Sequence, residues 1–155
     1  MKLDWKKLLL SLAIPLGTGG LAALLSGGMD SYNTLKQPPL SPPGWIFPIV
    51  WSILYLLMGY AAYRIATSDT SAEDRKHALT FYGIQLFLNF LWPILFFRFQ
   101  WYWAAFILLL LLWVFIYITM YRFEPIDETA ENLLIPYLLW VTFAGYLNLG
   151  VALLN

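Results

Sequence analysis

The chain of 155 residues is 61% hydrophobic and only 12% charged, and its mean hydropathy is +0.67. A soluble globular domain is about 45–50% apolar and about 25% charged, so this composition predicts a single domain embedded in a membrane. Nine basic and nine acidic residues balance to a net charge of zero, which argues against nucleic-acid binding. The absence of cysteine excludes disulfides and thiolate metal sites.

Five stretches of the sequence contain no Asp, Glu, Lys or Arg, and each can cross the hydrocarbon core, which takes about 20 residues. Their lack of period-two alternation predicts helices rather than the strands of a barrel. The sequence therefore predicts an all-α integral membrane protein, built as a bundle of five transmembrane helices. We expect the helices at about 7–26, 44–65, 77–97, 101–121 and 133–154.

Basic residues are distributed unevenly between the two ends of this predicted bundle. One end carries Lys36 and Arg98 only. The other end carries seven basic residues, namely Lys2, Lys6, Lys7, Arg64, Arg75, Lys76 and Arg122. The positive-inside rule then predicts a cytoplasmic N-terminus. Because the number of helices is odd, the C-terminus is expected outside.

The first predicted helix contains Pro15 and the small-residue cluster Gly17-Thr18-Gly19-Gly20, followed by Ala22 and Ala23. Small residues allow helix backbones to approach closely in lipid. Two interpretations stay open for this cluster: close packing against a neighbouring helix, or a thin wall beside a pocket. The apolar stretch continues to Leu25 without an A-x-A site, so we expect a retained helix rather than a cleaved signal peptide.

The segment from Gly27 to Gly44 is the longest connection that we expect to be non-helical, and it contains four prolines. Two Pro-Pro pairs hold the backbone extended and stiff. Long loops in small proteins are often functional. We therefore predict a Pro-rich lid over the mouth of the bundle, between the first and second helices.

The second and third predicted helices each carry one unusual face. In the second, Trp51, Tyr55, Gly59 and Ala62 share a face, which we expect to point into the bundle because it lacks the Leu and Ile of a lipid-facing stripe. In the third, one stripe is polar and aromatic and consists of Tyr82, Gln85, Asn89, Trp92 and Phe96. An unpaired amide at membrane depth costs about 1–3 kcal/mol. Gln85 and Asn89 must therefore point inward, to bond another helix or to contact a ligand.

The fourth predicted helix is mostly aliphatic, which suggests lipid exposure or a dimer surface. The aromatic residues 101–103 at its start are typical of an interfacial anchor, and Trp113 at mid-span is expected to pack in the core. The fifth helix has an aromatic and polar face made of Tyr137, Trp140, Ala144, Leu147 and Asn148.

Ordered motifs in three helices carry a resemblance to a known family. The motifs are Pro42-Pro43, Trp51, Leu54-Tyr55 and Met58-Gly59-Tyr60, then Tyr82, Gln85-Leu86, Leu88-Asn89, Trp92-Pro93 and Phe96-Phe97, and finally Pro136-Tyr137, Trp140, Phe143-Ala144 and Leu147-Asn148. In this order they resemble the TspO/MBR family, which comprises the tryptophan-rich sensory proteins of bacteria and the translocator proteins of mitochondria. The resemblance implies a bacterial cell-membrane protein that commonly forms homodimers, through helix three or four here. It also implies binding of porphyrins such as protoporphyrin IX and of benzodiazepine- or isoquinoline-type drugs, with no required cofactor.

The inward faces of helices two, three and five are expected to converge on one ligand site beneath the lid. Aromatic walls with a few oriented polar groups suit a flat, largely apolar ligand. The predicted ligand-binding residues are Tyr32, Pro42, Phe47, Trp51, Tyr55, Gln85, Asn89, Trp92, Tyr137, Trp140, Phe143, Ala144 and Leu147.

The chemistry expected at this site is limited. The single histidine, His77, lies at a loop–helix junction, so no metal site is predicted and axial haem ligation is disfavoured. No Ser-His-Asp set or carboxylate pair lies at membrane depth, so hydrolysis has no support.

Two alternatives to simple porphyrin binding remain. One is light- and oxygen-dependent breakdown of bound porphyrin, an activity that the resemblance brings with it, in which Trp51 and Trp140 react rather than only form the wall. The other is sterol or lipid transport. It is weakened because the chain after Asn148 lacks the Tyr and basic residue of the sterol-recognition pattern in animal members.

Overall fold

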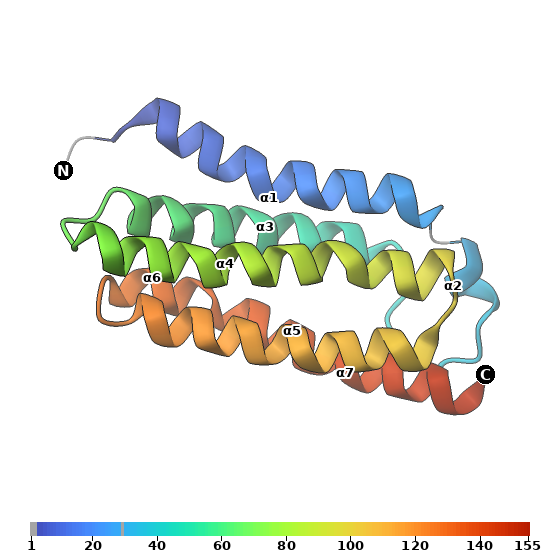
Figure 1. Cartoon of the computed structure of the whole chain (residues 1–155). Coiled ribbons are helices and arrows are strands. Elements are labelled where there is room, and N and C mark those ends of the chain that lie inside the picture. Colours follow the sequence, from blue (N-terminus) through green and yellow to red (C-terminus); the bar gives the residue numbers. More distant parts are fainter. Residues whose placement is uncertain (1–2, 29) are drawn as a thin grey trace.

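The computed structural model describes residues 3–28 and 30–155, and these residues contain helices and connections but no strand. Five helices are long and apolar enough to cross a membrane, as the sequence predicted, and they run side by side as one bundle (Figure 1). They are α1 (Trp5–Ser26), α3 (Ile46–Ala66), α4 (Ala72–Pro93), α5 (Tyr102–Phe123) and α7 (Ile135–Leu154). Three short elements complete the fold: α2 (Asp30–Thr34), the π-helical turn η1 (Ile94–Arg98) and α6 (Glu128–Leu133). Lys2, which we counted in the charge argument, lies outside the described residues.

Capping explains where these helices begin and why some start before the charge-free stretches. Asp4 caps α1 by accepting a bond from the Lys7 amide, and Ser71 caps α4 by accepting one from the Asp74 amide. Acidic side chains are favourable in a first helical turn, because they complement the helix dipole. The expected start of the third helix at residue 77 was therefore five residues late. The last span likewise begins earlier, with α6 capped by Asp127.

The N-terminal half of α1 packs tightly on α3. A Cβ atom on Gly59 would lie only 2.7 Å from the carbonyl oxygen of Ser11, so the two backbones are in contact there. Nearer the end, the Asp4 amide donates to the Tyr63 hydroxyl at 2.9 Å. The inward orientation of the Gly59 face of α3 is thus confirmed.

The segment between α1 and α3 is not wholly non-helical as we expected, because α2 occupies its first part. The rest is bonded back to α2, where the Tyr32 hydroxyl donates to the Pro42 carbonyl at 2.6 Å. Burial raises the pKa of the Tyr32 phenol above its ordinary value, so this donor keeps its proton at neutral pH. We call residues 35–43 the lid.

The lid is fastened to the end of α7. The Asn155 side chain accepts a bond from the Lys36 amide at 3.2 Å and donates one to the Lys36 carbonyl at 2.8 Å. Tyr146 donates to the Pro39 carbonyl at 2.7 Å. The start of α1 and the end of α7 lie at opposite ends of the bundle, as five spans require, and the lid lies at the end of α7 (Figure 1).

One aromatic residue is placed differently from expectation. Trp113 is not in the core but 37% exposed on α5, where it stacks on Tyr117 and donates to the Thr142 hydroxyl at 2.9 Å. A tryptophan can satisfy its single donor on a neighbouring helix and still face lipid. Its position at mid-span was therefore not enough to predict burial in the core.

Candidate functional site

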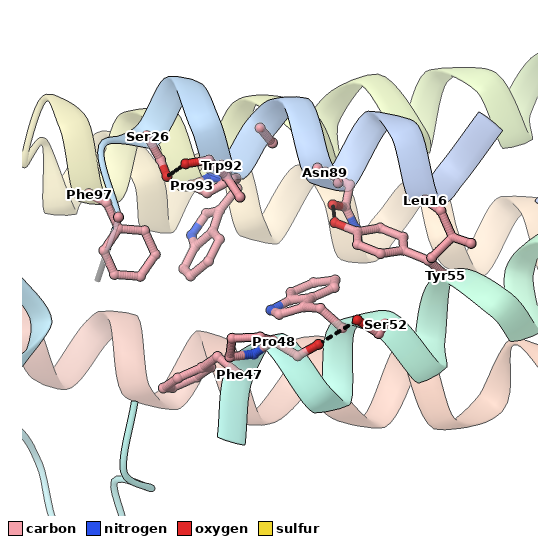
Figure 2. A pocket seen from close by; sticks show the side chains of 16 residues that line it. Leu16, Ser26, Phe47, Pro48, Ser52, Tyr55, Asn89, Trp92, Pro93 and Phe97 are labelled. Atoms are coloured by element: carbon pink, nitrogen blue, oxygen red, sulfur yellow. Dashed lines mark hydrogen bonds between the residues drawn. The ribbon is translucent and has the colours of Figure 1, made fainter. Parts of the chain in front are cut away.

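A partly enclosed space large enough for a small ligand lies between α1, α3 and α4, at the lid end of the bundle. Its volume is about 300 Å³, at the lower end of the usual range for ligand pockets. Figure 2 shows Trp92 and Phe97 on one side of this space and Phe47 and Pro48 on the other. The remaining lining residues are Leu16, Gly19, Gly20, Ala22, Ala23, Ser26, Gly28, Trp51, Ser52, Tyr55, Asn89 and Pro93. We call this space the α1 cavity.

The polar part of the α1 cavity wall is one end of a buried hydrogen-bond chain. The Tyr55 hydroxyl donates to Asn89 Oδ1 at 2.8 Å, and the pair is labelled in Figure 2. Asn89 Nδ2 donates to the Tyr137 hydroxyl at 2.7 Å, which in turn donates to Gln85 Oε1 at 2.7 Å. Asn89 therefore joins α3, α4 and α7. The interhelical interpretation of its amide is realised, while the residue also borders the cavity.

Gln85 and its neighbour Tyr82 are less completely satisfied. Gln85 Nε2 and the Tyr82 hydroxyl are buried with no hydrogen-bond partner among the described residues. Both lie on α4 away from the α1 cavity, so the predicted ligand contact of Gln85 is not direct in this structure.

Aromatic contacts hold the cavity wall in shape. Trp51 stacks on Tyr55 with ring centroids 5.6 Å apart and meets Tyr137 edge-on at 6.2 Å. Across the cavity, Trp92 stacks on Phe96 at 5.2 Å, and its Nε1 donates to Asn148 Oδ1 at 2.9 Å. The indole of Trp92 is thereby held by α7 while the residue lines the cavity.

Several of the predicted site residues gather in a cluster beneath the lid. Tyr32 packs edge-on against Phe47 at 5.1 Å, and Phe47 against Trp140 at 5.8 Å. Leu147 completes the core of this cluster, and Phe143 packs against it. We call these five residues the lid cluster. The void beside it, which Ala144 also lines, measures only about 20 Å³ and is too small for any ligand.

The structure therefore divides the predicted site in two. Phe47, Trp51, Tyr55, Asn89 and Trp92 line the α1 cavity. The remaining residues do not: Tyr32, Pro42, Gln85, Tyr137, Trp140, Phe143, Ala144 and Leu147. The reason is that α1, rather than α7, forms the wall facing α3 and α4 at this depth.

Some of these residues border other spaces. Tyr32 and Pro42 border an open hollow of about 780 Å³ on the surface around the lid. Trp140 and Phe143 border a shallow groove between α3 and α7. The Trp140 Nε1 atom is buried without a hydrogen-bond partner in the described part of the chain.

The lining residues that sequence reasoning missed come mainly from α1, and η1 adds Phe97. The small residues Gly19, Gly20, Ala22 and Ala23 all line the cavity, which fits the interpretation of a thin wall beside a pocket. Close packing against α3 occurs nearer the start of α1, at Ser11. The glycine cluster was the available signal for this wall. Phe97 had no such signal, because its position depends on the π-helical turn after Pro93.

Fold and site together define a class: a small helical membrane protein with five spans and an aromatic cavity near one end. The comparisons with known proteins agree with it. Residues 10–154 match the profile described as the TspO/MBR family, and the chain belongs to that family.

Similar proteins occur in bacteria and animals. The chain is 37% identical to the tryptophan-rich sensory protein of Cereibacter sphaeroides over all of this chain and 95% of that protein. It is 40% identical to the tryptophan-rich protein TspO of Chlorobaculum tepidum over 80% of this chain and 78% of the relative. It is also 36% identical to the translocator protein of Ovis aries over 86% and 80% of the two chains.

Proposed function

We propose that this protein is a membrane receptor that binds porphyrins, with protoporphyrin IX as the representative ligand, in the α1 cavity. The observation that carries the proposal is the cavity's composition. Trp51 and Trp92 supply flat apolar walls, and the Tyr55–Asn89 pair supplies one polar edge. Such a site recognises a flat apolar ligand by stacking and orients it by a few polar contacts. Benzodiazepine- and isoquinoline-type compounds share this chemistry and are proposed as further ligands.

A tetrapyrrole needs more room than the 300 Å³ of the α1 cavity offers. Phe47 and Phe97 line both this cavity and the small void of the lid cluster. Rotation of these two side chains would join the two spaces. We therefore expect a porphyrin to displace them, while a smaller drug-like ligand binds without this change.

The test is an absorbance titration of the purified protein with protoporphyrin IX in the dark. A saturable shift of the porphyrin bands, reversed by an excess of an isoquinoline-type competitor, is the expected result. A spectrum identical to that of porphyrin in empty detergent micelles would contradict the proposal.

The second candidate function is light- and oxygen-dependent degradation of the bound porphyrin. Trp51 favours it, because this oxidisable indole lines the cavity in stacking contact with Tyr55. Trp140 favours it less, since it lies in the lid cluster. Illumination of the complex in air distinguishes the two: loss of the porphyrin bands that depends on the protein and disappears in Trp51→Phe supports turnover. A bound spectrum that stays stable under light supports a receptor alone.

Assembly and orientation remain predictions. We propose a homodimer, for which the exposed apolar side chains of α5, such as Ile107, Leu110 and Val114, offer a surface. We also propose a cytoplasmic N-terminus, on the charge distribution given above. Crosslinking in native membranes tests the first, and accessibility of single introduced cysteines to an impermeant reagent tests the second.

A further inference from the structure

The α1 cavity reaches the outer surface of the bundle between α1 and α3. Six of its lining residues are exposed. Leu16, Gly20 and Ala23 on α1 and Pro48 and Ser52 on α3 form the rim between the two helices, and Gly28 follows the end of α1. Further toward the N-terminal end, the Gly59–Ser11 contact closes the same pair of helices. The two backbones thus touch at Gly59 and Ser11, and nearer the lid a cavity with exposed rims lies between the two helices.

This mouth lies at hydrocarbon depth. Gly20 lies six residues before the end of α1 at Ser26, and Ser52 six residues after the start of α3 at Ile46. At 1.5 Å per residue, both positions are about 9 Å inside the lid-side ends of their helices. Half of a hydrocarbon core is about 15 Å, so the rim faces acyl chains of the lid-side half of the bilayer.

The route past the lid is obstructed by contrast. The lid is bonded to α7 through Asn155 and Tyr146. Gly150 adds a steric contact, because Pro38 of the lid occupies the space where a Cβ atom would stand. Beneath it, the lid cluster leaves a void of only about 20 Å³. A ligand arriving from water would have to break the fastening and part this cluster.

We propose that the α1 cavity takes its ligand sideways from the bilayer, through the mouth between α1 and α3. The ligand class is accordingly one that dissolves in the hydrocarbon of the lid-side leaflet: flat, largely apolar and amphipathic at one edge. This inference rests on the proposed function, since it concerns the route to the same site. Gly20 lies on the rim of this mouth, and nothing lies within 4 Å of the position that a Cβ atom on it would take. A larger side chain at this position would therefore narrow the mouth.

The first test measures protoporphyrin IX association and dissociation by stopped-flow fluorescence in nanodiscs. Gly20→Phe places a ring in the mouth between α1 and α3. Gly17→Phe is the matched control, because Gly17 is also exposed on α1, also has nothing within 4 Å of its Cβ position and does not line the cavity. We expect Gly20→Phe to slow association at least fivefold and Gly17→Phe to stay within twofold of wild type. Equal association rates in the two variants would overturn the proposed lateral route. Faster dissociation of Gly20→Phe with unchanged association would overturn it as well, because Gly20 would then contact the bound ligand and the ligand would enter elsewhere.

The second test closes the other route in a properly folded protein. Because the chain has no cysteine, the pair Lys36→Cys and Asn155→Cys introduces one disulfide that ties the lid to α7, where these residues already touch. Association to the oxidised form should match that to the same protein after reduction. A tenfold slower rate in the oxidised form would overturn the lateral route and leave the proposed function intact. Failure of wild type to bind protoporphyrin IX at all would instead overturn the proposed function and the lateral route with it.

Discussion

The α1 cavity and the lid cluster lie side by side at one end of the bundle and share Phe47, yet they are built differently. The cavity combines a wall of glycine and alanine from α1 with aromatic side chains from α3 and α4, and about 300 Å³ stays open. The lid cluster sets aromatic rings from α2, α3 and α7 edge to face, and only about 20 Å³ remains. In this protein, aromatic residues border open space where the facing helix carries side chains too small to fill it.

The same contrast assigns different roles to the two tryptophans that the sequence singled out. Trp51 borders open volume and is held by Tyr55 and Tyr137. Trp140 packs against Phe47 and Phe143. The four predictions that follow test this difference and the scaffold that produces it.

The largest effect is expected from truncating the two tryptophans separately. Trp51→Ala removes a stacking wall of the α1 cavity, and loss of about 1.5–3 kcal/mol of apolar contact raises the Kd for protoporphyrin IX roughly 10- to 150-fold. Trp140→Ala, the control, should raise it less than fivefold. Absorbance titration measures both. The reverse order of the two variants would mean that the ligand occupies the lid cluster.

The next effect concerns the buried hydrogen-bond chain. Asn89→Leu leaves the Tyr55 and Tyr137 hydroxyls without their amide partner, so the free energy of unfolding should fall by about 1–3 kcal/mol. Gln85→Leu breaks a single bond, from Tyr137, and should cost less. Unfolding by increasing mole fractions of SDS, followed by helical circular dichroism, compares them. Equal losses would show that Asn89 is not the centre of the chain.

A third pair tests the two halves of α1. Gly59→Ala places a methyl group against the Ser11 carbonyl, and we expect this overpacking to lower the unfolding free energy by about 1–3 kcal/mol. Gly20→Ala points into free space and should not lower it. The same SDS titration measures both variants. If Gly20→Ala were as damaging as Gly59→Ala, the cavity would be closed in solution.

The smallest effect is expected at the lid. Tyr146→Phe removes one hydrogen bond to the Pro39 carbonyl, which contributes about 0.5–1.5 kcal/mol. Hydrogen exchange of the lid amides should accelerate while exchange in α4 and α5 stays the same. Unchanged exchange at the lid would show that this bond does not fasten it.

The sequence predicted best those features that the lipid environment dictates, namely the membrane spans and the orientation of polar side chains. Charges are costly in hydrocarbon, so the charge-free stretches located all five spans, and the unpaired-amide argument correctly turned Asn89 inward. Helix ends were less predictable, because Ser71 and its acidic neighbours extend α4 by capping that a charge-free criterion ignores.

The predicted site residues were expected to converge on one space, and the structure places them around separate spaces for a different physical reason. Tyr137, Trp140 and Ala144 do face inward, but whether an inward residue meets space or another side chain depends on the size of the helix opposite it. Gly19 and Gly20 fit both close packing and a thin wall. Their pattern alone did not show that α1 borders the cavity.

The most direct test of the central claim is protection of single cysteines by bound protoporphyrin IX. Ala23 lines the α1 cavity, whereas its neighbour Leu24 is 80% exposed and does not line it. The variants Ala23→Cys and Leu24→Cys are labelled with a membrane-permeant maleimide, with and without porphyrin. We predict that porphyrin slows labelling of Ala23→Cys at least fivefold and leaves Leu24→Cys unchanged. Saturating porphyrin that protects neither position would contradict the assignment of the ligand to this cavity.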